Sequence, residues 1–242
     1  MTKRLDQYLV DNSWYETRNK AKNAIVNNLI LVNNKTVDKP SYEVKEQDVI
    51  TKVKVQEYVS RGAYKLLAAI NEWKIDFHNE VVLDVGASTG GFTEISLLHG
   101  AKLVYAIDVG TDQLHHSLKK NSNVISLEKT HFKDLTNKDI PEKIDIVVAD
   151  ISFISLTKLM DKLDKLISYP YRCVFLIKPE FELSPNELNK GKVKNSKLEE
   201  KAIHKVTQYA LALHYHITGV IPSPIKGNKL QNTEYLLYMD KK

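Results

Sequence analysis

The chain has 242 residues, of which 43% are hydrophobic and 27% charged, and its formal net charge is +5. This composition supplies a folded core and excludes an intrinsically disordered chain. No run approaches the roughly 20 apolar residues of a membrane span, and the N-terminus lacks the apolar core of a signal peptide. Cys173, the only cysteine, lies in an apolar run, so we expect a buried, inert thiol in a reducing, cytoplasmic compartment. The basic charge suits a polyanionic partner.

Residues 1–57 are predicted to form a small α+β domain. Apolar side chains at helical spacing predict two helices, around 5–10 and 17–25, and short β-type runs follow at 29–32, 36–37 and 48–50. Asn33 and Asn34 predict a tight turn between the first two runs, because asparagine tolerates positive φ. Basic side chains on this segment are candidates for nucleic-acid binding: Lys3, Arg4, Arg18, Lys20 and Lys22.

This segment resembles the small RNA-binding domain of ribosomal protein S-four and of pseudouridine synthases. The resemblance is carried by Arg4-Leu5-Asp6, by Thr17-Arg18-x-x-Ala21 and by residues 29–33. It implies a basic two-helix face that binds structured RNA through phosphates and shape. Asn28 and Asn34 stand where that domain usually has glycine, and acidic residues offset part of the basic charge. We therefore expect a modest docking module.

Residues 58–62 are assigned to an interdomain linker, and residues 63–242 to an α/β domain. A helix is predicted at 63–70, with Ser60 as its expected cap. Strands are predicted at 81–85, 103–107, 124–127, 144–149, 173–177, 216–221 and 235–239, with helices such as 92–98, 156–167 and 197–213 between most of them. This alternation predicts a mostly parallel sheet covered on both faces, and the last two strands, joined only by a loop, are expected to form an antiparallel pair at its edge.

The strand at 81–85 runs into a glycine-rich turn with the spacing G-x-x-x-G-G. This differs from the G-x-G-x-x-G that approaches a pyrophosphate, and so favours a nucleoside cofactor without phosphates, with S-adenosylmethionine the leading candidate. Asp108 ends the next strand, where a carboxylate can accept ribose hydroxyls. The candidate cofactor-binding residues from this pattern are Asp84, Gly86, Ala87, Ser88, Thr89, Gly90, Gly91, Phe92, Asp108 and Asp150.

Charged residues also stand at the ends of later strands. Asp150 and Lys178 each follow an apolar strand directly, so both are expected at the carboxyl edge of the sheet. A lysine at such a position is costly to bury unpaired, which leaves open either an ion pair with Asp150 or a chemical role. Glu234 precedes the last strand, and Lys65 lies on the first helix of the domain.

From residue 58 onwards the chain resembles the TlyA (hemolysin A) family, which has the FtsJ-type ribose methyltransferase fold. The matching stretches are 58–66, 83–93, 150–156, 177–182 and 222–225. With the N-terminal domain included, the resemblance covers nearly the whole chain. It implies a Rossmann-like methyltransferase sheet, mostly parallel with an antiparallel last strand, behind a small α+β RNA-binding domain. It also implies the catalytic set Lys65, Asp150, Lys178 and Glu234.

The same resemblance implies S-adenosylmethionine as methyl donor and the ribose 2′-hydroxyl of a cytidine in ribosomal RNA as acceptor, in the large subunit and in some relatives also the small one. Val109 and His131 are added as cofactor-binding candidates and Arg61 as an RNA-binding candidate. His131 replaces an asparagine expected there, and the loop 227–231 lacks a second glycine often present. A monomer is expected.

A ribose hydroxyl is a poor nucleophile, whereas a sulfonium methyl group is already activated, so the expected task is in-line positioning and help with the departing proton. Lys178 is either a general base or an electrostatic stabiliser of the alkoxide. One alternative is a membrane-active hemolysin, which the lack of a membrane span or a long basic amphipathic helix disfavours. The other is a non-catalytic ribosomal-RNA-binding factor, which the retained polar set disfavours. No metal site is expected, because His115 and His116 are adjacent and point in different directions on a helix, and His214 and His216 lack a third partner.

Overall fold

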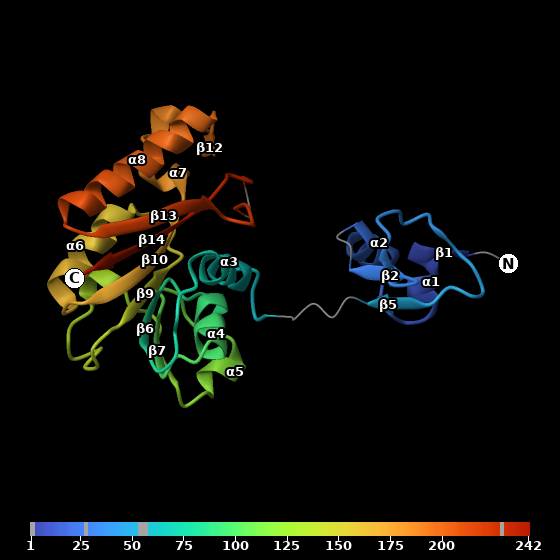
Figure 1. The fold of residues 1–242 in the computed structure, drawn as a ribbon, viewed down its shortest axis with the longest axis horizontal. Coiled ribbons are helices and arrows are strands. Elements are labelled where there is room, and N and C mark those ends of the chain that lie inside the picture. The colour runs from blue at the N-terminus through green and yellow to red at the C-terminus, as the bar shows by residue number, and fades with distance from the viewer. Residues whose placement is uncertain (1–2, 27–28, 53–57, 228–229) are drawn as a thin grey trace. The chain divides into compact units, whose positions relative to one another are not determined.

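The structure is a computed structural model that describes residues 3–26, 29–52, 58–227 and 230–242. Contacts divide the chain into two compact units, residues 1–57 and 58–242 (Figure 1). Residues 58–62, expected as a linker, lie in the second unit: Tyr58 packs against its core, and the Val59 backbone N–H donates to Glu94 Oε2 at 2.7 Å. Asn28, which stands at a usual glycine position, lies outside the described residues.

The first unit packs two short helices on short strands. Helices α1 (Leu5–Asp11) and α2 (Arg18–Val26) bury Leu5, Leu9 and Ile25, among others, in its core. Strands β3 (Lys35–Thr36), β2 (Ile30–Val32) and β5 (Ile50–Lys52) form one sheet, and β1 (Lys3–Arg4) pairs with β4 (Glu43–Val44). Asn33 and Asn34, with φ of 53° and 61°, make the two-residue turn between β2 and β3. The predicted turn is confirmed.

A seven-stranded sheet forms the centre of the second unit, in the order β13-β14-β10-β9-β6-β7-β8. Its strands are β6 (Val81–Val85), β7 (Leu103–Ile107), β8 (Val124–Leu127), β9 (Ile146–Ala149), β10 (Tyr171–Ile177), β13 (His216–Pro222) and β14 (Tyr235–Lys241). β14 runs antiparallel to β10 and β13, and the other neighbouring pairs are parallel. The predicted mostly parallel Rossmann-like sheet with an antiparallel last strand is confirmed.

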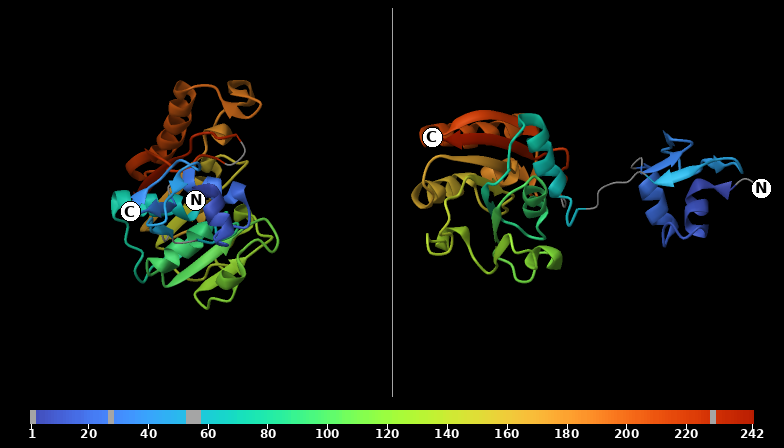
Figure 2. Two further views of the ribbon diagram at one scale, coloured as in Figure 1. Left: turned by 90° about the vertical axis from the view of Figure 1, so that its right-hand side faces the viewer. Right: turned by 60° about the horizontal axis from the view of Figure 1, so that its bottom comes forward.

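Helices cover both faces of this sheet, as Figure 2 also shows. Alternate residues of β6 explain this: Val82 packs with α3 (Ala63–Trp73) and α4 (Gly91–Leu98), whereas Leu83 and Val85 pack with α6 (Leu156–Leu166) and α8 (Ser196–Ala212) on the other face. Both faces of the strands are therefore apolar. The shorter elements are α5 (His116–Lys119), η1 (Phe132–Asp134), α7 (Pro179–Glu182), η2 (Pro185–Glu187), β11 (Leu188–Asn189) and β12 (Lys192–Val193).

The start of α3 differs from the prediction. Gly62 is the N-cap residue and no side-chain cap is present, so Ser60 does not cap this helix. Residues 60–62 instead form a turn, in which the Ala63 N–H donates to the Ser60 carbonyl at 3.2 Å. The Ser60 hydroxyl oxygen instead lies directly against Gly91, where a side chain would have no room. This contact joins the beginning of the unit to its glycine-rich loop.

Candidate active site

A cavity of about 810 Å³ opens at the carboxyl ends of the central strands. Its walls come from the glycine-rich loop after β6, from residues directly after β9 and β10, from the start of α3 and from the loop before β14. In open α/β sheets ligands bind at this edge, because loops from neighbouring strands meet there. The volume is within the usual range for small-molecule sites.

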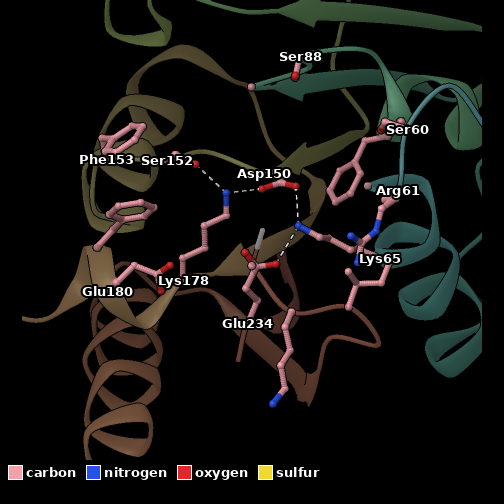
Figure 3. Close-up of a pocket in the computed structure, with 18 of the residues that line it drawn as sticks. Ser60, Arg61, Lys65, Ser88, Asp150, Ser152, Phe153, Lys178, Glu180 and Glu234 are labelled. Atoms are coloured by element: carbon pink, nitrogen blue, oxygen red, sulfur yellow. Dashed lines mark hydrogen bonds and ion pairs between the residues drawn. The ribbon is translucent and has the colours of Figure 1, made fainter. Parts of the chain in front are cut away.

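Four charged side chains form a continuous chain in this cavity (Figure 3). Lys178 Nζ lies 2.6 Å from Asp150 Oδ1, and Lys65 Nζ lies 3.0 Å from Asp150 Oδ2 and 2.8 Å from Glu234 Oε2. The ion pair between Lys178 and Asp150, left open by the sequence, is present. Two ammonium groups and two carboxylates balance each other, which makes their burial tolerable.

Burial and pairing act differently on the three members with shifted pKa values. Burial opposes the charge of Lys65, but Asp150 and Glu234 outweigh it and raise the pKa of Lys65. Burial alone would raise the pKa of Asp150, but Lys178 and Lys65 bring it below its usual range. Burial raises the pKa of Glu234, and Lys65 offsets only part of this. Glu234 is therefore the carboxylate of the set that most readily holds a proton.

The glycine-rich loop passes so close to its neighbours that side chains would not fit. A Cβ atom on Gly91 would lie 2.3 Å from Ser60 Oγ and 2.7 Å from the Ala63 nitrogen. Gly86 has a φ of +84°, and a Cβ atom there would lie 3.0 Å from the Asp150 carbonyl oxygen. These glycines bring loop backbone, helix α3 and Asp150 around one small space.

Asp84 is not at the cavity surface, contrary to its assignment as a cofactor-binding residue. It is fully buried, and Thr93 Oγ1 donates to its Oδ2 at 2.6 Å while Oδ1 has no hydrogen-bond partner within the described residues. Burial raises the pKa of Asp84 to about 7. The reason is geometric: Asp84 is the fourth residue of β6, and its side chain turns beneath α4 rather than into the cavity.

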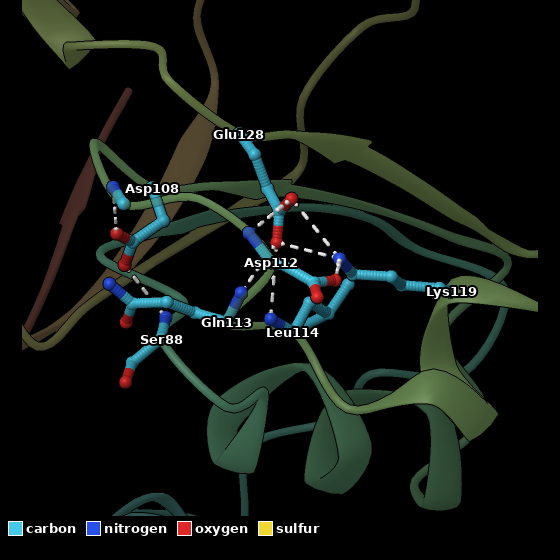
Figure 4. Close-up of polar contacts among 8 residues, drawn as sticks. Ser88, Asp108, Asp112, Gln113, Leu114, Lys119 and Glu128 are labelled. Carbon is cyan, nitrogen blue, oxygen red and sulfur yellow. Dashed lines mark hydrogen bonds and ion pairs between the residues drawn. The ribbon is translucent and has the colours of Figure 1, made fainter.

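Asp108 holds the glycine-rich loop through backbone hydrogen bonds (Figure 4). Its carboxylate accepts from the Ser88 nitrogen at 2.8 Å and from the Gly110 nitrogen at 2.7 Å. Beside it, the carboxylate of Glu128 accepts from the backbone nitrogens of residues 112, 113 and 114. The Lys119 ammonium, together with these donors, lowers the pKa of Glu128 to about 2. Sequence reasoning missed Glu128, although an acid directly after the third strand was a readable signal.

The remaining cofactor-binding candidates divide into two groups. Those that line the cavity are Gly86, Ala87, Ser88, Thr89, Gly91, Phe92 and Asp150. Gly90, Asp108, Val109 and His131 are not among its lining residues. Gly90 instead packs under the side chains of Leu114 and Leu118, and the His131 ring accepts from the Lys133 nitrogen at 3.2 Å.

The RNA-binding candidates lie in both units. Lys3, Arg4, Arg18 and Lys20 are exposed on the first unit, and Lys22 is half-buried there. The buried Asp6 carboxylate accepts from Arg4 Nε at 3.1 Å and from Arg18 Nη2 at 2.9 Å, which fixes two guanidinium groups side by side. Arg61 belongs to the second unit and lines the cavity. The sequence places all six residues in one group of RNA-binding candidates and does not distinguish the first unit from the cavity of the second.

Several residues that sequence reasoning missed also lie in or at the cavity. The Lys178 ammonium donates to Ser152 Oγ at 2.8 Å, and Phe153 beside it is 88% exposed with a φ of 67°. The ring of Phe181 lies 5.1 Å from that of Phe153. Glu180 lines the cavity from α7. A positive φ is uncommon at a bulky residue. At Phe153 this backbone conformation accompanies a ring that lies at the surface.

Other expectations concern residues outside the cavity. Cys173 is buried, as predicted, and burial raises the pKa of its thiol well above the usual value. Of the described residues, no three histidine, cysteine or acidic side chains are grouped so that they could hold a metal ion. Within the described ranges, no helix combines the length and apolar character needed to cross a bilayer.

Comparisons with known proteins match this architecture. Residues 58–241 match the FtsJ-like methyltransferase family, and residues 3–50 match the S4 domain. The chain is 37% identical over 237 residues to hemolysin A of Brachyspira hyodysenteriae, covering 97% of this chain and 98% of that protein. It is 36% identical over 239 residues to the 16S/23S rRNA (cytidine-2′-O)-methyltransferase TlyA of Mycobacterium tuberculosis strain H37Rv, covering 98% and 89%.

A solved structure agrees with these sequence matches. A Streptococcus thermophilus protein described as a hemolysin has a TM-score of 0.76 and 33% identity, over 100% of this chain and 89% of that one. The chain therefore belongs to the FtsJ-like methyltransferase family, among the S4-domain relatives named hemolysin A or TlyA.

Proposed function

We propose that this protein transfers a methyl group from S-adenosylmethionine to the 2′-hydroxyl of a cytidine ribose in ribosomal RNA of the large subunit. The printed activity of the TlyA relative supports the acceptor, and the S4 match supports ribosomal RNA as the partner. The observation that carries the proposal is the continuous chain Lys178–Asp150–Lys65–Glu234 in a cavity walled by the glycine-rich loop. Because its substrate is the ribosome, we assign its action to the cytoplasm.

The residues around the cavity fit S-adenosylmethionine. Gly86 and Gly91 leave backbone without side chains at the wall, and Asp108 fixes the loop behind it by accepting from the Ser88 nitrogen. When bound, this cofactor supplies a methyl group that its sulfonium has already activated. The chain's own contribution is then to bind, orient and manage the charge of the acceptor hydroxyl.

Lys178 is the residue best placed for that charge. As an ammonium it has three N–H donors, of which one is directed to Asp150 and one to Ser152. The third is left for the ribose 2′-oxygen, whose negative charge grows as its proton departs. Asp150 holds Lys178 in place, and Lys65 links Asp150 to Glu234. We assign Lys178 the role of electrostatic stabiliser.

Methyl transfer to purified ribosomal subunits tests this function. With tritiated S-adenosylmethionine, wild-type protein is expected to label ribosomal RNA of the large subunit, and Lys178→Ala to lose about a hundredfold or more in rate, the range for removing one preorganised donor. Lys158→Ala, at an exposed position of α6, is the matched control. Calorimetry is expected to show unchanged cofactor affinity in both variants. Near-normal transfer by Lys178→Ala would contradict the proposal.

Mapping ribose methylation in ribosomal RNA from cells lacking the protein identifies the nucleotide. The expected result is one lost 2′-O-methylcytidine in the large subunit. Loss in the small subunit as well would extend the substrate, and loss of no ribose methylation would contradict the proposed acceptor.

A further inference from the structure

No described residue balances the charge of Glu180. It lines the cavity from α7, and its Oε2 atom is buried without a hydrogen-bond partner among the described residues. Glu182 in the same helix differs: its carboxylate accepts from Ser155 Oγ at 2.5 Å and from the Leu156 nitrogen at 2.7 Å, and it pairs with Lys205. A carboxylate that is partly buried without a donor is costly, so a donor from outside the chain would be favoured where Glu180 lines the cavity.

The two lysines of the charged set are already engaged, and Arg61 and Lys226 also line the cavity. Lys178 and Lys65 pair with Asp150 and Glu234, and no ion pair to Glu180 is present in the described part of the chain. A Cβ atom on Gly227 would lie 3.2 Å from Glu234 Oε1 and 3.9 Å from Glu180 Oε1, so the two carboxylates border the same space. Glu180 adds one negative charge to a set that is otherwise neutral.

Glu180 also lies on the side of the charged set away from the glycine-rich loop, which is the side we assign to the methyl acceptor. Figure 3 shows it on the opposite side of the Lys178–Asp150 pair from Ser88, which marks the glycine-rich loop. The surface next to it is aromatic: Phe181 adjoins Glu180 in sequence, and the exposed Phe153 packs on Phe181. Flat apolar rings beside a carboxylate suit a planar nucleobase with an N–H donor better than they suit a sugar.

We propose that the Glu180 carboxylate selects the base of the acceptor nucleotide by accepting a hydrogen bond from the exocyclic N4 amine of cytosine. Carboxylates pair with this amine, whereas uracil presents a carbonyl oxygen at the same position and would be repelled. Glu180 is then a specificity residue, separate from the groups that act on the 2′-hydroxyl. This inference rests on the proposed function, because it assigns the base of that same acceptor.

The test compares ribosomal subunits that carry either cytidine or uridine at the methylated position. The measured quantity is the ratio of kcat/KM for the two substrates. Wild-type protein is expected to prefer cytidine by about five- to a hundredfold, the discrimination typical of one good base contact. Glu180→Gln is expected to bring the ratio below about threefold, chiefly by slowing methylation of cytidine, since its amide can also donate to the uracil oxygen.

Two further variants make the result specific. Glu180→Asp keeps the carboxylate but shortens its reach, and an intermediate ratio is expected. Glu200→Gln makes the same charge change at an exposed position of α8 and is expected to keep the wild-type ratio. Calorimetry is expected to show unchanged S-adenosylmethionine affinity in all of them, since Glu180 faces away from the glycine-rich loop.

The outcomes separate this inference from the proposed function. No methyl transfer by wild-type protein to either substrate would refute the proposed function. Transfer with a cytidine preference that Glu180→Gln leaves unchanged would refute only the role of Glu180. Equal loss on cytidine and uridine would also refute it, because the carboxylate would then support the catalytic set and not the base.

Discussion

Replacing Lys65 with methionine removes the cation that joins the two carboxylates of the catalytic set. The side chains of Lys65 and Glu234 are only 11% and 4% exposed. Asp150 keeps Lys178, whereas Glu234 loses its only ion pair within the described residues. Removing one partner of a buried pair costs about 3–5 kcal/mol. Because burial raises the pKa of Glu234, this carboxyl can take up a proton, and we expect about 3 kcal/mol lower free energy of unfolding at pH 7.

The second unit can be followed by its own fluorophore. The chain has two tryptophans: Trp14 in the first unit and Trp73 at the end of α3, stacked on Tyr238. In a Trp14→Phe background, the fluorescence of Trp73 reports unfolding of the second unit alone. Urea titration with linear extrapolation then gives the free energy of unfolding for each variant.

A double-mutant cycle shows whether the loss comes from the unpaired carboxylate. Glu234→Gln added to Lys65→Met is expected to recover about 1–2 kcal/mol, because a neutral amide needs no counter-ion. Lys158→Met, at an exposed position of α6, is expected to stay within about 0.5 kcal/mol of the parent. A loss below about 1 kcal/mol for Lys65→Met, or strictly additive losses in the double variant, would refute the reasoning.

Two other predictions concern carboxylates outside this set. Burial raises the pKa of Asp84 from 3.8 to about 7, so between these pH values the folded state keeps a proton that the unfolded state releases. The free energy of unfolding should therefore fall with rising pH across this window, by up to about 4 kcal/mol, and level off above it. Urea titrations of Asp84→Asn at several pH values are expected to lack this fall, and parallel curves for variant and wild type would contradict the assignment. Asp6→Asn is expected to weaken binding of a ribosomal RNA fragment roughly three- to tenfold, because Arg4 and Arg18 lose the shared carboxylate charge and one of its two acceptor oxygens. The salt dependence should hardly change, since both arginines keep their charge; filter binding at several salt concentrations would expose a large change in slope.

Local patterns in the sequence were enough for most of the secondary structure. Alternating and continuous apolar runs predicted all seven strands of the large sheet, because the apolar pattern within a strand shows which of its faces are buried. The antiparallel last strand followed from the absence of a predicted helix between it and its predecessor, because a loop alone joins the two. Asn33 and Asn34 predicted their turn, because positive φ is a property of the residue type. The start of α3 was predicted less well, since the Ser60 hydroxyl packs on a loop distant in sequence.

The sequence by itself determined the candidates for the site: a glycine-rich turn after an apolar strand, and four charged residues at or near element ends. Only the tertiary structure decided how they meet. Strand order brings Lys65 and Asp150, 85 positions apart, to 3.0 Å. Asp84 is buried away from the cavity, whereas Glu180 lines it with an Oε2 atom that no described residue hydrogen-bonds. The physical reason is that the spacing of apolar residues shows which side chains of a single helix or strand are buried, but not which other element covers them. Contacts between elements depend instead on the order and register of strands, which no local pattern specifies.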